Sequence, residues 1–259
     1  MSEKLSGSKG SILPALAALA SLNMLSCQKG NDAAAPSQTV YIYVDSTQLP
    51  ANAVADVDGN VYSTVTIGSQ RWMAENLRTN HYTNGDLVPY RPDNTEWAGL
   101  PTGAWTNYDT DAAYDGQYGK LYNWYTVVDP RNVCPSGWHV PSDSDWMELE
   151  SSLGLPLTDL DLYGDRGSVV NVGGQLKSTA FWSSPNTGAN DSSGFSGYPG
   201  GTRLAQGTFN SVSTMGIWWS ASEHDTTVAW LRELLTSSAG VSRLYHFKTQ
   251  GCSIRCVED

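Results

Sequence analysis

The residues best suited to chemistry are the cysteines of the second half of the chain, Cys134, Cys252 and Cys256. Cys252 and Cys256 could form a redox-active or copper-binding pair, whereas a structural disulfide would use only one of them. On an extended strand their Cα atoms would lie about 13 Å apart, and a disulfide requires about 7 Å or less. We therefore expect one of them to bond to Cys134 and the other to be a buried free thiol or an intermolecular partner.

Acidic residues cluster at two places in the chain. Asp109-Thr110-Asp111, followed by Asp115, resembles the start of a calcium loop, but Ala113 and Lys120 stand where an EF-hand needs a ligand and a bidentate glutamate. We expect solvated carboxylates in turns. Glu223-His224-Asp225 is a tight acid–base cluster. Because no nucleophile adjoins it in the sequence, we interpret it as a loop.

The sequence lacks the motifs of the common enzyme classes. It contains no Gly-x-Ser-x-Gly elbow, no P-loop and no dinucleotide fingerprint. The four histidines lack the close spacing of zinc ligands; they are His81, His139, His224 and His246. We therefore expect no enzyme, no metal site and no cofactor, with bound calcium as the one alternative.

Aromatic residues offer the remaining candidates for binding. One group lies in regions rich in Asn and Asp, where the rings could stack on sugars or anchor long loops to the core; it comprises Trp97, Trp105, Tyr108, Tyr114 and Tyr118. A second group lies in patterned segments and is expected in the core; it comprises Trp138, Trp146, Trp218 and Trp230.

Composition and charge limit the classes of protein that fit. The chain has 259 residues, of which 16% are charged, with 25 Gly, ten Trp and thirteen Tyr. This mix is typical of a loop-rich extracellular fold. The net charge of -11 argues against a nucleic-acid partner, because binding to phosphates needs a basic surface.

The N-terminal segment predicts export and lipidation. Lys4 and Lys9 precede an apolar run from Ile12 to Leu25, which is too short to span a bilayer, and Ser26-Cys27 follows. We expect a lipoprotein signal peptide over 1–26, lipidation at Cys27, a flexible tether over 27–53 and a folded domain over 54–259. A plain cleaved signal with an incidental cysteine is the alternative.

The secondary structure expected for the domain consists of strands and long loops around two short helices. Asp58-Gly59 marks a turn, and Gly154 ends the second helix. Arg78 to Gly119 has no periodicity and is expected to be loop. We expect Cys252, Ile254 and Cys256 to face inward, with Ser253 and Arg255 facing out. The expected elements are a hairpin (61–67 and 70–77), helices (121–128 and 142–153), a short strand in the tether (40–44) and C-terminal antiparallel strands (217–221, 228–235, 241–247 and 253–257).

Several ordered motifs make the chain resemble the Fibrobacter succinogenes major paralogous domain, a family common among exported bacterial lipoproteins. The resemblance covers about Asp56 to Asp259. The motifs that carry it are Asp58-Gly59-Asn60-Val61-Tyr62, Trp72-Met73-Ala74-Glu75-Asn76-Leu77, Tyr118-Gly119-Lys120-Leu121-Tyr122-Asn123-Trp124-Tyr125, Cys134-Pro135-Ser136-Gly137-Trp138-His139-Val140-Pro141, Ser184-Pro185-Asn186-Thr187-Gly188, Gly200-Gly201-Thr202-Arg203, Trp218-Trp219-Ser220 and Ser253-Ile254-Arg255-Cys256-Val257.

This family is similar to the C-type-lectin-like fold shared with formylglycine-generating enzymes. The resemblance implies an α+β domain in which two short helices pack on a twisted antiparallel β-sheet with long irregular loops. It implies adjacent N- and C-terminal strands. It also implies a Cys134–Cys256 disulfide, with Cys252 as the additional cysteine.

The sequence departs from the functional motifs of the wider fold. Sugar-binding lectins that use calcium carry Glu-Pro-Asn and Trp-Asn-Asp, whereas here Ser184 precedes Pro185-Asn186 and Trp-Asn-Asp is missing. Nothing matches the catalytic cysteine pair of the enzymes, which precedes their final Arg-Cys.

We therefore expect a non-enzymatic lipoprotein of the outer membrane, exposed at the cell surface, that binds a carbohydrate or protein ligand through its long loops. The candidate binding residues are Trp97, Trp105, Tyr108, Tyr114 and Asn186. Two alternatives are an oxidoreductase like the formylglycine generators, using copper or thiols at Cys252 and Cys256, and a structural envelope protein.

Overall fold

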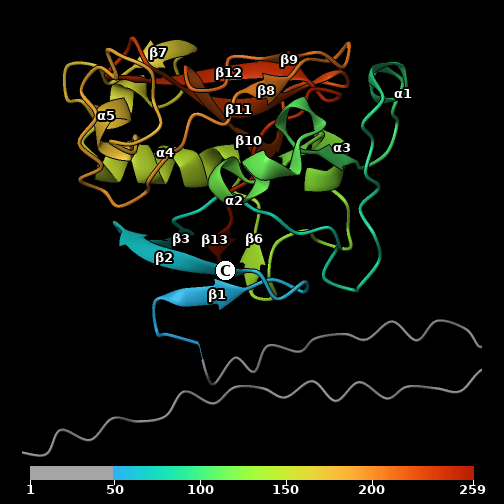
Figure 1. The fold of residues 1–259 in the computed structure, drawn as a ribbon. Helices are drawn as coiled ribbons and strands as arrows, with labels where there is room; N and C mark the ends of the chain where they lie inside the picture. The colour runs from blue at the N-terminus through green and yellow to red at the C-terminus, as the bar shows by residue number, and fades with distance from the viewer. Residues whose placement is uncertain (1–48) are drawn as a thin grey trace, which may run out of the picture. The chain divides into compact units, whose positions relative to one another are not determined.

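The computed structural model describes residues 49–259. The expected signal peptide, the lipidation of Cys27 and the strand at 40–44 lie outside the described residues. The described part is a mixed α and β structure with mostly antiparallel sheets and few short helices (Figure 1). None of its helices is both long and apolar enough to span a bilayer.

One sheet joins the two ends of the described chain. Its strands, in spatial order, are β1 (Ala53–Ala55), β2 (Val61–Ile67), β3 (Gln70–Met73), β13 (Val257–Glu258) and β6 (Trp138–His139). The predicted hairpin is confirmed as β2 and β3, although β3 ends at Met73, earlier than expected. Val257 of β13 pairs with Trp72 of β3, so the last strand lies beside the second strand of the N-terminal hairpin, whereas β1 lies at the edge of the sheet beside β2.

A second sheet carries the longest strands. Its order is β10 (Met215–Glu223), β11 (Val228–Leu235), β12 (Val241–Phe247) and β7 (Gly164–Arg166), all antiparallel. The bounds of β11 and β12 are those predicted, and β10 extends its predicted strand at both ends. Two further ladders have two strands each: β4 (Trp105–Thr106) with β5 (Leu121–Tyr122), and β8 (Thr202–Arg203) with β9 (Phe209–Asn210).

The helix α4 (Asp143–Ser152) agrees with its prediction. Ser142 and Asp145 form a capping box at its start, where each side chain accepts a hydrogen bond from the backbone of the other. Trp146 and Leu149 are buried, and Gly154 follows the C-cap with a positive φ of 98°. α4 packs against β10 and β11 and thereby covers one face of the second sheet (Figure 1).

The first predicted helix was wrong over its first half. Leu121 and Tyr122 form β5, and the helix α3 is limited to Trp124–Val127. Asn123 separates the two elements because its side-chain oxygen accepts hydrogen bonds from the backbone nitrogens of Thr126 and Ala104. The first bond caps α3, and the second ties it to the neighbouring loop.

Short helices also occur where the sequence predicted only loops. They are α1 (Asn94–Ala98), α2 (Asp115–Tyr118), α5 (Val172–Leu176) and the 3₁₀ turns Tyr108–Thr110, Ala112–Tyr114 and Leu157–Asp159. α5 was not predicted because it contains two glycines, and glycine disfavours helices. Both are required there by close packing: a Cβ on Gly173 would overlap the carbonyl of Gly240, and one on Gly174 that of Gly188.

The closing segment 251–256 contradicts the predicted strand at 253–257. It makes isolated bridges from Gly251 to Arg203, from Cys252 to Tyr122 and from Ser253 to Trp218, and only Val257–Glu258 is a strand. Ser253 and Arg255, which we expected to face out, are buried. The reason is that the segment contacts β5, β8 and β10, so that neither of its faces meets solvent.

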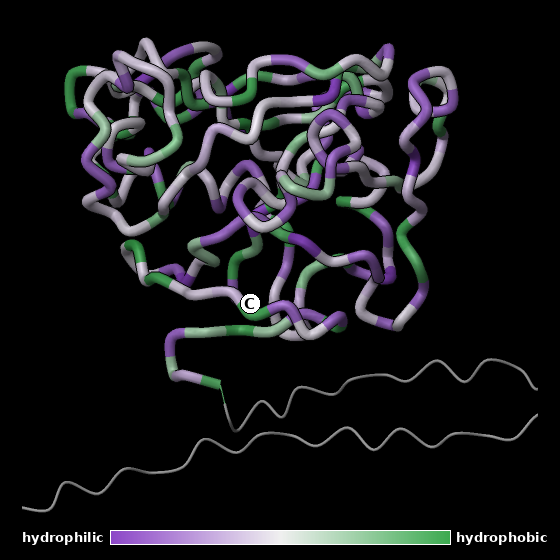
Figure 2. The backbone as a smooth tube through the Cα atoms, in the orientation of Figure 1, coloured by the Kyte–Doolittle hydropathy of each residue, from purple (hydrophilic) through white to green (hydrophobic). Residues whose placement is uncertain are grey.

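The buried side chains form two clusters. One surrounds Trp219 and the disulfide, and the other surrounds Trp146 and the neighbouring Trp218. Adjacent residues of β10 thus point to opposite faces, as in any strand. Trp230, which we expected in the core, is only half-buried. Figure 2 shows the hydrophobic residues of 49–259 spread over many short stretches.

The cysteines form the pair that the family resemblance implies. Cys134 and Cys256 are joined by a disulfide that links positions 122 residues apart. Cys252 is a buried free thiol, and its burial raises its pKa well above the usual value for a thiol.

Three fully buried cationic side chains hold the long loops in place by donating hydrogen bonds to backbone carbonyl oxygens. Lys177 donates from Nζ to the carbonyl oxygens of Thr187, Leu235 and Ser238, and burial lowers its pKa to about 8. Arg203 donates to the carbonyl oxygens of Arg91 and Pro92 in a distant segment and of Gly207 in its own loop. Arg255 donates to the carbonyl oxygens of Phe195 and Ser196. We call these three side chains the buried cations. Each lies beside aromatic rings, which adds cation–π attraction.

An ionic network joins α4 to the second sheet. Glu150 of α4 is fully buried and accepts hydrogen bonds from Arg166 and Arg232, while Asp143 accepts from Arg232 and Arg243. Burial alone would raise the pKa of Asp143, but the two arginines outweigh it and lower the pKa below 3.8.

Candidate functional site

A cleft with a volume of about 400 Å³ lies where four separate segments meet. We call it the aromatic cleft; its lining residues are Glu75, Asn76, Arg78, Gly116, Gln117, Gly119, Phe181 and Tyr198. The first three follow β3, the next three belong to α2 and its C-cap, and the last two lie in the long loops before β8.

Asn76 fixes the floor of the aromatic cleft. Its Nδ2 donates to the carbonyl oxygen of Tyr118 (2.8 Å) and to Ser253 Oγ (3.2 Å). Its Oδ1 accepts from Trp218 Nε1 (2.8 Å) and Arg255 Nη2 (2.7 Å). The amide is thereby fully satisfied, which holds the segment after β3, α2 and the closing segment in a fixed arrangement.

Gly119 allows the backbone of the two walls to approach closely. Its φ is 72°, and a Cβ there would lie 2.8 Å from Asn76 Cβ and 2.9 Å from the carbonyl oxygen of Leu77. Only glycine meets both conditions without strain.

The cleft stands beside a row of aromatic rings, which we call the aromatic row. Tyr114 packs against Tyr108 (5.5 Å between ring centroids) and Tyr118 (5.9 Å). Phe181 then packs against Tyr118 (6.3 Å) and Tyr198 (5.6 Å). Because Phe181 remains 52% exposed, its ring is available to a ligand.

The polar groups of the cleft are of several kinds. Glu75 accepts a hydrogen bond from the backbone nitrogen of Ser63 through Oε2. The guanidinium of Arg78 lies over the ring of Tyr62 and donates to the carbonyl oxygen of Val61. Gln117 and Tyr198 are partly exposed and add an amide and a hydroxyl. The cleft thus combines an apolar ring with neutral and charged hydrogen-bonding groups.

The predicted binding residues do not form one site. Tyr108 and Tyr114 lie in the aromatic row. Trp105 is partly buried against Tyr90 and below Lys120. Asn186 is half-buried and donates from Nδ2 to the carbonyl oxygen of Ser178, so it stabilises its own loop.

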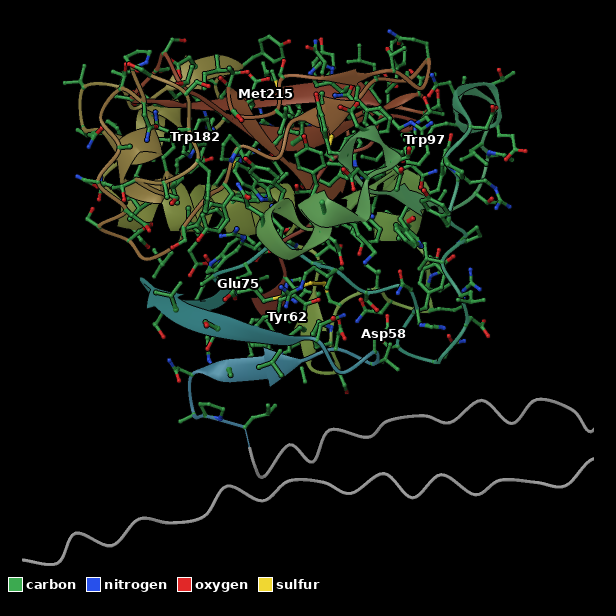
Figure 3. All side chains as sticks on the ribbon, in the orientation of Figure 1. Asp58, Tyr62, Glu75, Trp97, Trp182 and Met215 are labelled. Carbon is green, nitrogen blue, oxygen red and sulfur yellow. A yellow bond between two sulfur atoms is a disulfide. The ribbon has the colours of Figure 1, made fainter. Side chains whose placement is uncertain are left out.

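Trp97 was wrongly predicted to bind a ligand. It is fully buried, donates from Nε1 to the carbonyl oxygen of Thr249 and packs under Arg203, so it anchors α1 to the core. Figure 3 shows Trp97 well away from Glu75. Of the two roles that we expected for aromatic residues in loops, Trp97 therefore has the anchoring role.

Sequence reasoning missed Glu75, Gln117, Phe181 and Tyr198 as site residues. Only Glu75 and Gln117 had a signal in the sequence, because they lie within or next to the family motifs. Phe181 and Tyr198 lie in segments rich in turn residues, which provide no such signal. Their proximity depends on how the long loops fold, which the periodicity of a sequence does not report.

The acidic clusters have structural partners. Asp111 caps a 3₁₀ turn by accepting from the backbone nitrogen of Ala113, and Asp115 pairs with Lys120 at 2.9 Å. Glu223 pairs with Lys248, and Asp225 caps the turn before β11. Within residues 49–259, no group of three or more His, Cys, Asp or Glu side chains has the arrangement of a metal site.

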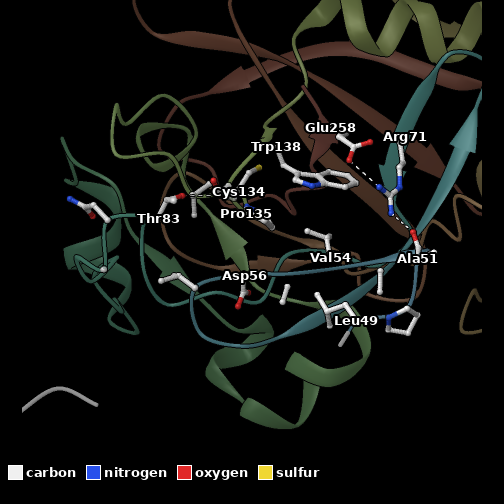
Figure 4. Close-up of a pocket in the computed structure, with 18 residues that line it drawn as sticks. Leu49, Ala51, Val54, Asp56, Arg71, Thr83, Cys134, Pro135, Trp138 and Glu258 are labelled. Atoms are coloured by element: carbon white, nitrogen blue, oxygen red, sulfur yellow. Dashed lines mark hydrogen bonds and ion pairs between the residues drawn. The ribbon is translucent and has the colours of Figure 1, made fainter. Parts of the chain in front are cut away.

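A larger cavity, of about 900 Å³, opens on the first sheet (Figure 4). It is lined by β1, by the loop that carries the disulfide and by Trp138. Several of its polar groups already pair within the protein: Arg71 bonds to Glu258 (2.9 Å) and to the carbonyl oxygen of Ala51, and Asp56 accepts from Tyr62. Part of the polar lining of this cavity is therefore engaged within the protein.

Comparison with known proteins identifies a family. None of the curated proteins and none of the solved structures matches the chain. The model of the Fibrobacter succinogenes major domain matches residues 65–258, which include both sheets apart from β1 and the first residues of β2, and all of the aromatic cleft. The chain therefore belongs to the Fibrobacter succinogenes major domain family.

Proposed function

We propose that the protein is a non-enzymatic binding module that recognises a carbohydrate in the aromatic cleft. The observation that carries this proposal is the exposed ring of Phe181 at the wall of a cleft that also holds Gln117, Tyr198 and Glu75. An aromatic ring can stack on the C–H face of a sugar, while amide, hydroxyl and carboxylate groups bond to its hydroxyls.

The size and rigidity of the cleft favour a small ligand over a protein surface. About 400 Å³ lies within the range of small-molecule sites and suits one or two sugar rings. The hydrogen bonds of Asn76 and the contacts of Gly119 fix the walls before any ligand arrives, which reduces the entropy lost on binding. The alternative ligand of similar size is a single polar side chain presented by a protein.

We further propose that the module is a lipoprotein of the outer membrane, exposed at the cell surface through Cys27 and a tether, with a C-type-lectin-like fold. The sequence of 1–53 supports the anchor. The position of the last strand beside the N-terminal hairpin, and the packing of helices α3 and α4 on the second sheet, support the fold.

The two alternative functions have less support. An oxidoreductase would need Cys252 and Cys256 as reactive thiols, but Cys256 is bonded to Cys134 and Cys252 is buried. A structural envelope protein would need its exposed aromatic residues to pack on neighbouring proteins, which crosslinking in intact cells would detect.

A glycan array tests the proposed function. The full chain is applied with calcium and with a chelator, because the sequence leaves calcium dependence open. Binding to one or more glycans is expected, and Phe181→Ala should weaken it about tenfold through the loss of one stacked ring. Leu157→Ala removes another exposed side chain (76% exposed) and serves as the matched control. The proposal fails if no glycan is retained or if Phe181→Ala binds like the unaltered protein.

A further inference from the structure

A second group of aromatic rings lies on the second sheet, apart from the aromatic cleft. Trp230 of β11 and Tyr245 of β12 are direct cross-strand partners. His224, in the turn before β11, stacks on Tyr245 with 4.0 Å between ring centroids, and Tyr163 packs on the same ring at 5.2 Å. Phe247 follows Tyr245 on the same face of β12. We call these five residues the sheet platform.

The sheet platform is exposed. Tyr163 is 61%, Phe247 59% and Tyr245 37% accessible to solvent. Adjacent exposed aromatic residues of this size are uncommon on a monomeric protein and indicate a surface that binds something.

The platform is held in place by a cation on the same face of the sheet. The guanidinium of Arg243 lies 3.5 Å from the centre of the Trp230 ring. Arg243 is fixed in turn by Asp143 and by the carbonyl oxygen of Asp161. The positions of the rings are thus set by a sheet and by the ionic network, so that little side-chain entropy is lost when a ligand stacks on them.

The charges near the platform limit the chemistry of its ligand. Glu223 and Asp225 flank His224 in the chain, and Asp161 lies two residues before Tyr163. Glu223 is paired with Lys248, but the carboxylates of Asp161 and Asp225, on a chain of net charge -11, repel anionic lipids and acidic polysaccharides and can accept hydrogen bonds from neutral hydroxyls. The hydroxyls of Tyr163 and Tyr245 and the imidazole of His224 add further polar groups beside the rings.

We propose that the sheet platform binds an extended neutral polysaccharide by stacking against the faces of its sugar rings. Because the rings of Tyr163, His224 and Trp230 all contact the ring of Tyr245, they form one continuous aromatic surface, which suits more sugar units than the aromatic cleft. The platform shares no residue with the aromatic cleft, so this proposal stands or falls separately from the proposed function.

Retention on insoluble neutral glycans tests the proposal. The full chain is mixed with microcrystalline β-1,4-glucan, insoluble β-1,3-glucan and chitin, and the unbound protein is measured over a range of concentrations. Retention on at least one of them is expected, and the double variant Tyr163→Ala/Phe247→Ala should weaken it about tenfold or more. Tyr163→Phe keeps the ring and should stay within about twofold of the unaltered protein, since ring stacking is the main contact. Leu157→Ala is again the control for an exposed apolar side chain.

Further measurements separate this proposal from others. Retention should persist in 1 M NaCl, because stacking is not screened by salt. The double variant should weaken retention by the same factor in the unaltered protein and in a Phe181→Ala background, which distinguishes the platform from the cleft. The proposal is overturned if none of the three glycans retains the protein or if the double variant binds equally well. It is also overturned if sedimentation shows that the double variant abolishes a dimer and that retention requires the dimer.

Discussion

Arg255 donates a hydrogen bond of 2.7 Å to the side-chain oxygen of Asn76, although 179 residues separate the two in the chain. The same oxygen accepts from Trp218, and Arg255 also donates to the carbonyl oxygens of Phe195 and Ser196. One buried guanidinium therefore connects the floor of the aromatic cleft with the closing segment and a long loop.

Replacing Arg255 with methionine should lower the free energy of unfolding by about 3 kcal/mol, because two buried carbonyl oxygens would lose this donor and the amide oxygen of Asn76 would keep only Trp218. Urea unfolding measures the change. The matched control is Arg91→Met, since the side chain of Arg91 is partly exposed and donates only to the carbonyl oxygen of its neighbour Tyr90; its effect should stay below about 0.5 kcal/mol. Equal effects of the two variants would contradict a structural role for Arg255.

Replacing Gly119 with alanine should lower the free energy of unfolding by about 2 kcal/mol, since the new Cβ meets Asn76 in a backbone conformation that disfavours side chains. Glycan binding to the aromatic cleft should weaken in parallel. Gly99→Ala is the control, because its φ is -101° and no atom lies within 4 Å of the added Cβ. If both variants unfold at the same urea concentration, the close contact at Gly119 does not determine the stability of the alanine variant.

Asp143 should make stability depend on pH in the acid range. Its pKa is lowered in the folded protein, so its contribution is fully present above pH 3.8 and is lost as the pH falls through the folded pKa. Asp143→Asn should therefore cost about 3 kcal/mol at pH 7, and progressively less below pH 3.8. Urea titrations at pH 7, 4 and 3 measure this difference, with the exposed Asp109→Asn as the control. A difference that is constant over this range would contradict the assignment.

Cys252 should resist alkylation while the protein is folded, because the thiol is buried and its raised pKa suppresses the reactive thiolate. Treatment with iodoacetamide at pH 8, followed by peptide mass mapping, should show label at Cys252 only after unfolding in urea. The Cys134–Cys256 peptide pair should remain linked without reductant. Labelling of native Cys252 within minutes would show that the closing segment opens readily.

Local patterns in the sequence predicted those elements whose signals are local. α4 was predictable because Ser142 is a good N-cap and Trp146 and Leu149 follow at helical spacing. β11 and β12 were predictable because turn residues separate two apolar runs. The first helix was wrong because the same apolar run suits a buried strand or a helix, and a side-chain bond from Asn123 decides between them.

The aromatic cleft could not be predicted from such patterns. Arg255 was expected to face solvent because it alternates with Cys256 along a predicted strand. It is buried because other segments cover both faces of the closing segment. Trp97 and Phe181 lie in equally irregular text, and only the folded loops show that one is buried and the other exposed.

The buried cations have a consequence for how this scaffold can vary. Lys177, Arg203 and Arg255 hold the loops by donating to backbone carbonyl oxygens. Every amino acid supplies such an oxygen, so these bonds do not depend on particular loop side chains. A loop residue held in this way can be exchanged for another without losing the bond that keeps the loop in place. Substitutions of these loop residues should therefore change the loop surface while the architecture is kept.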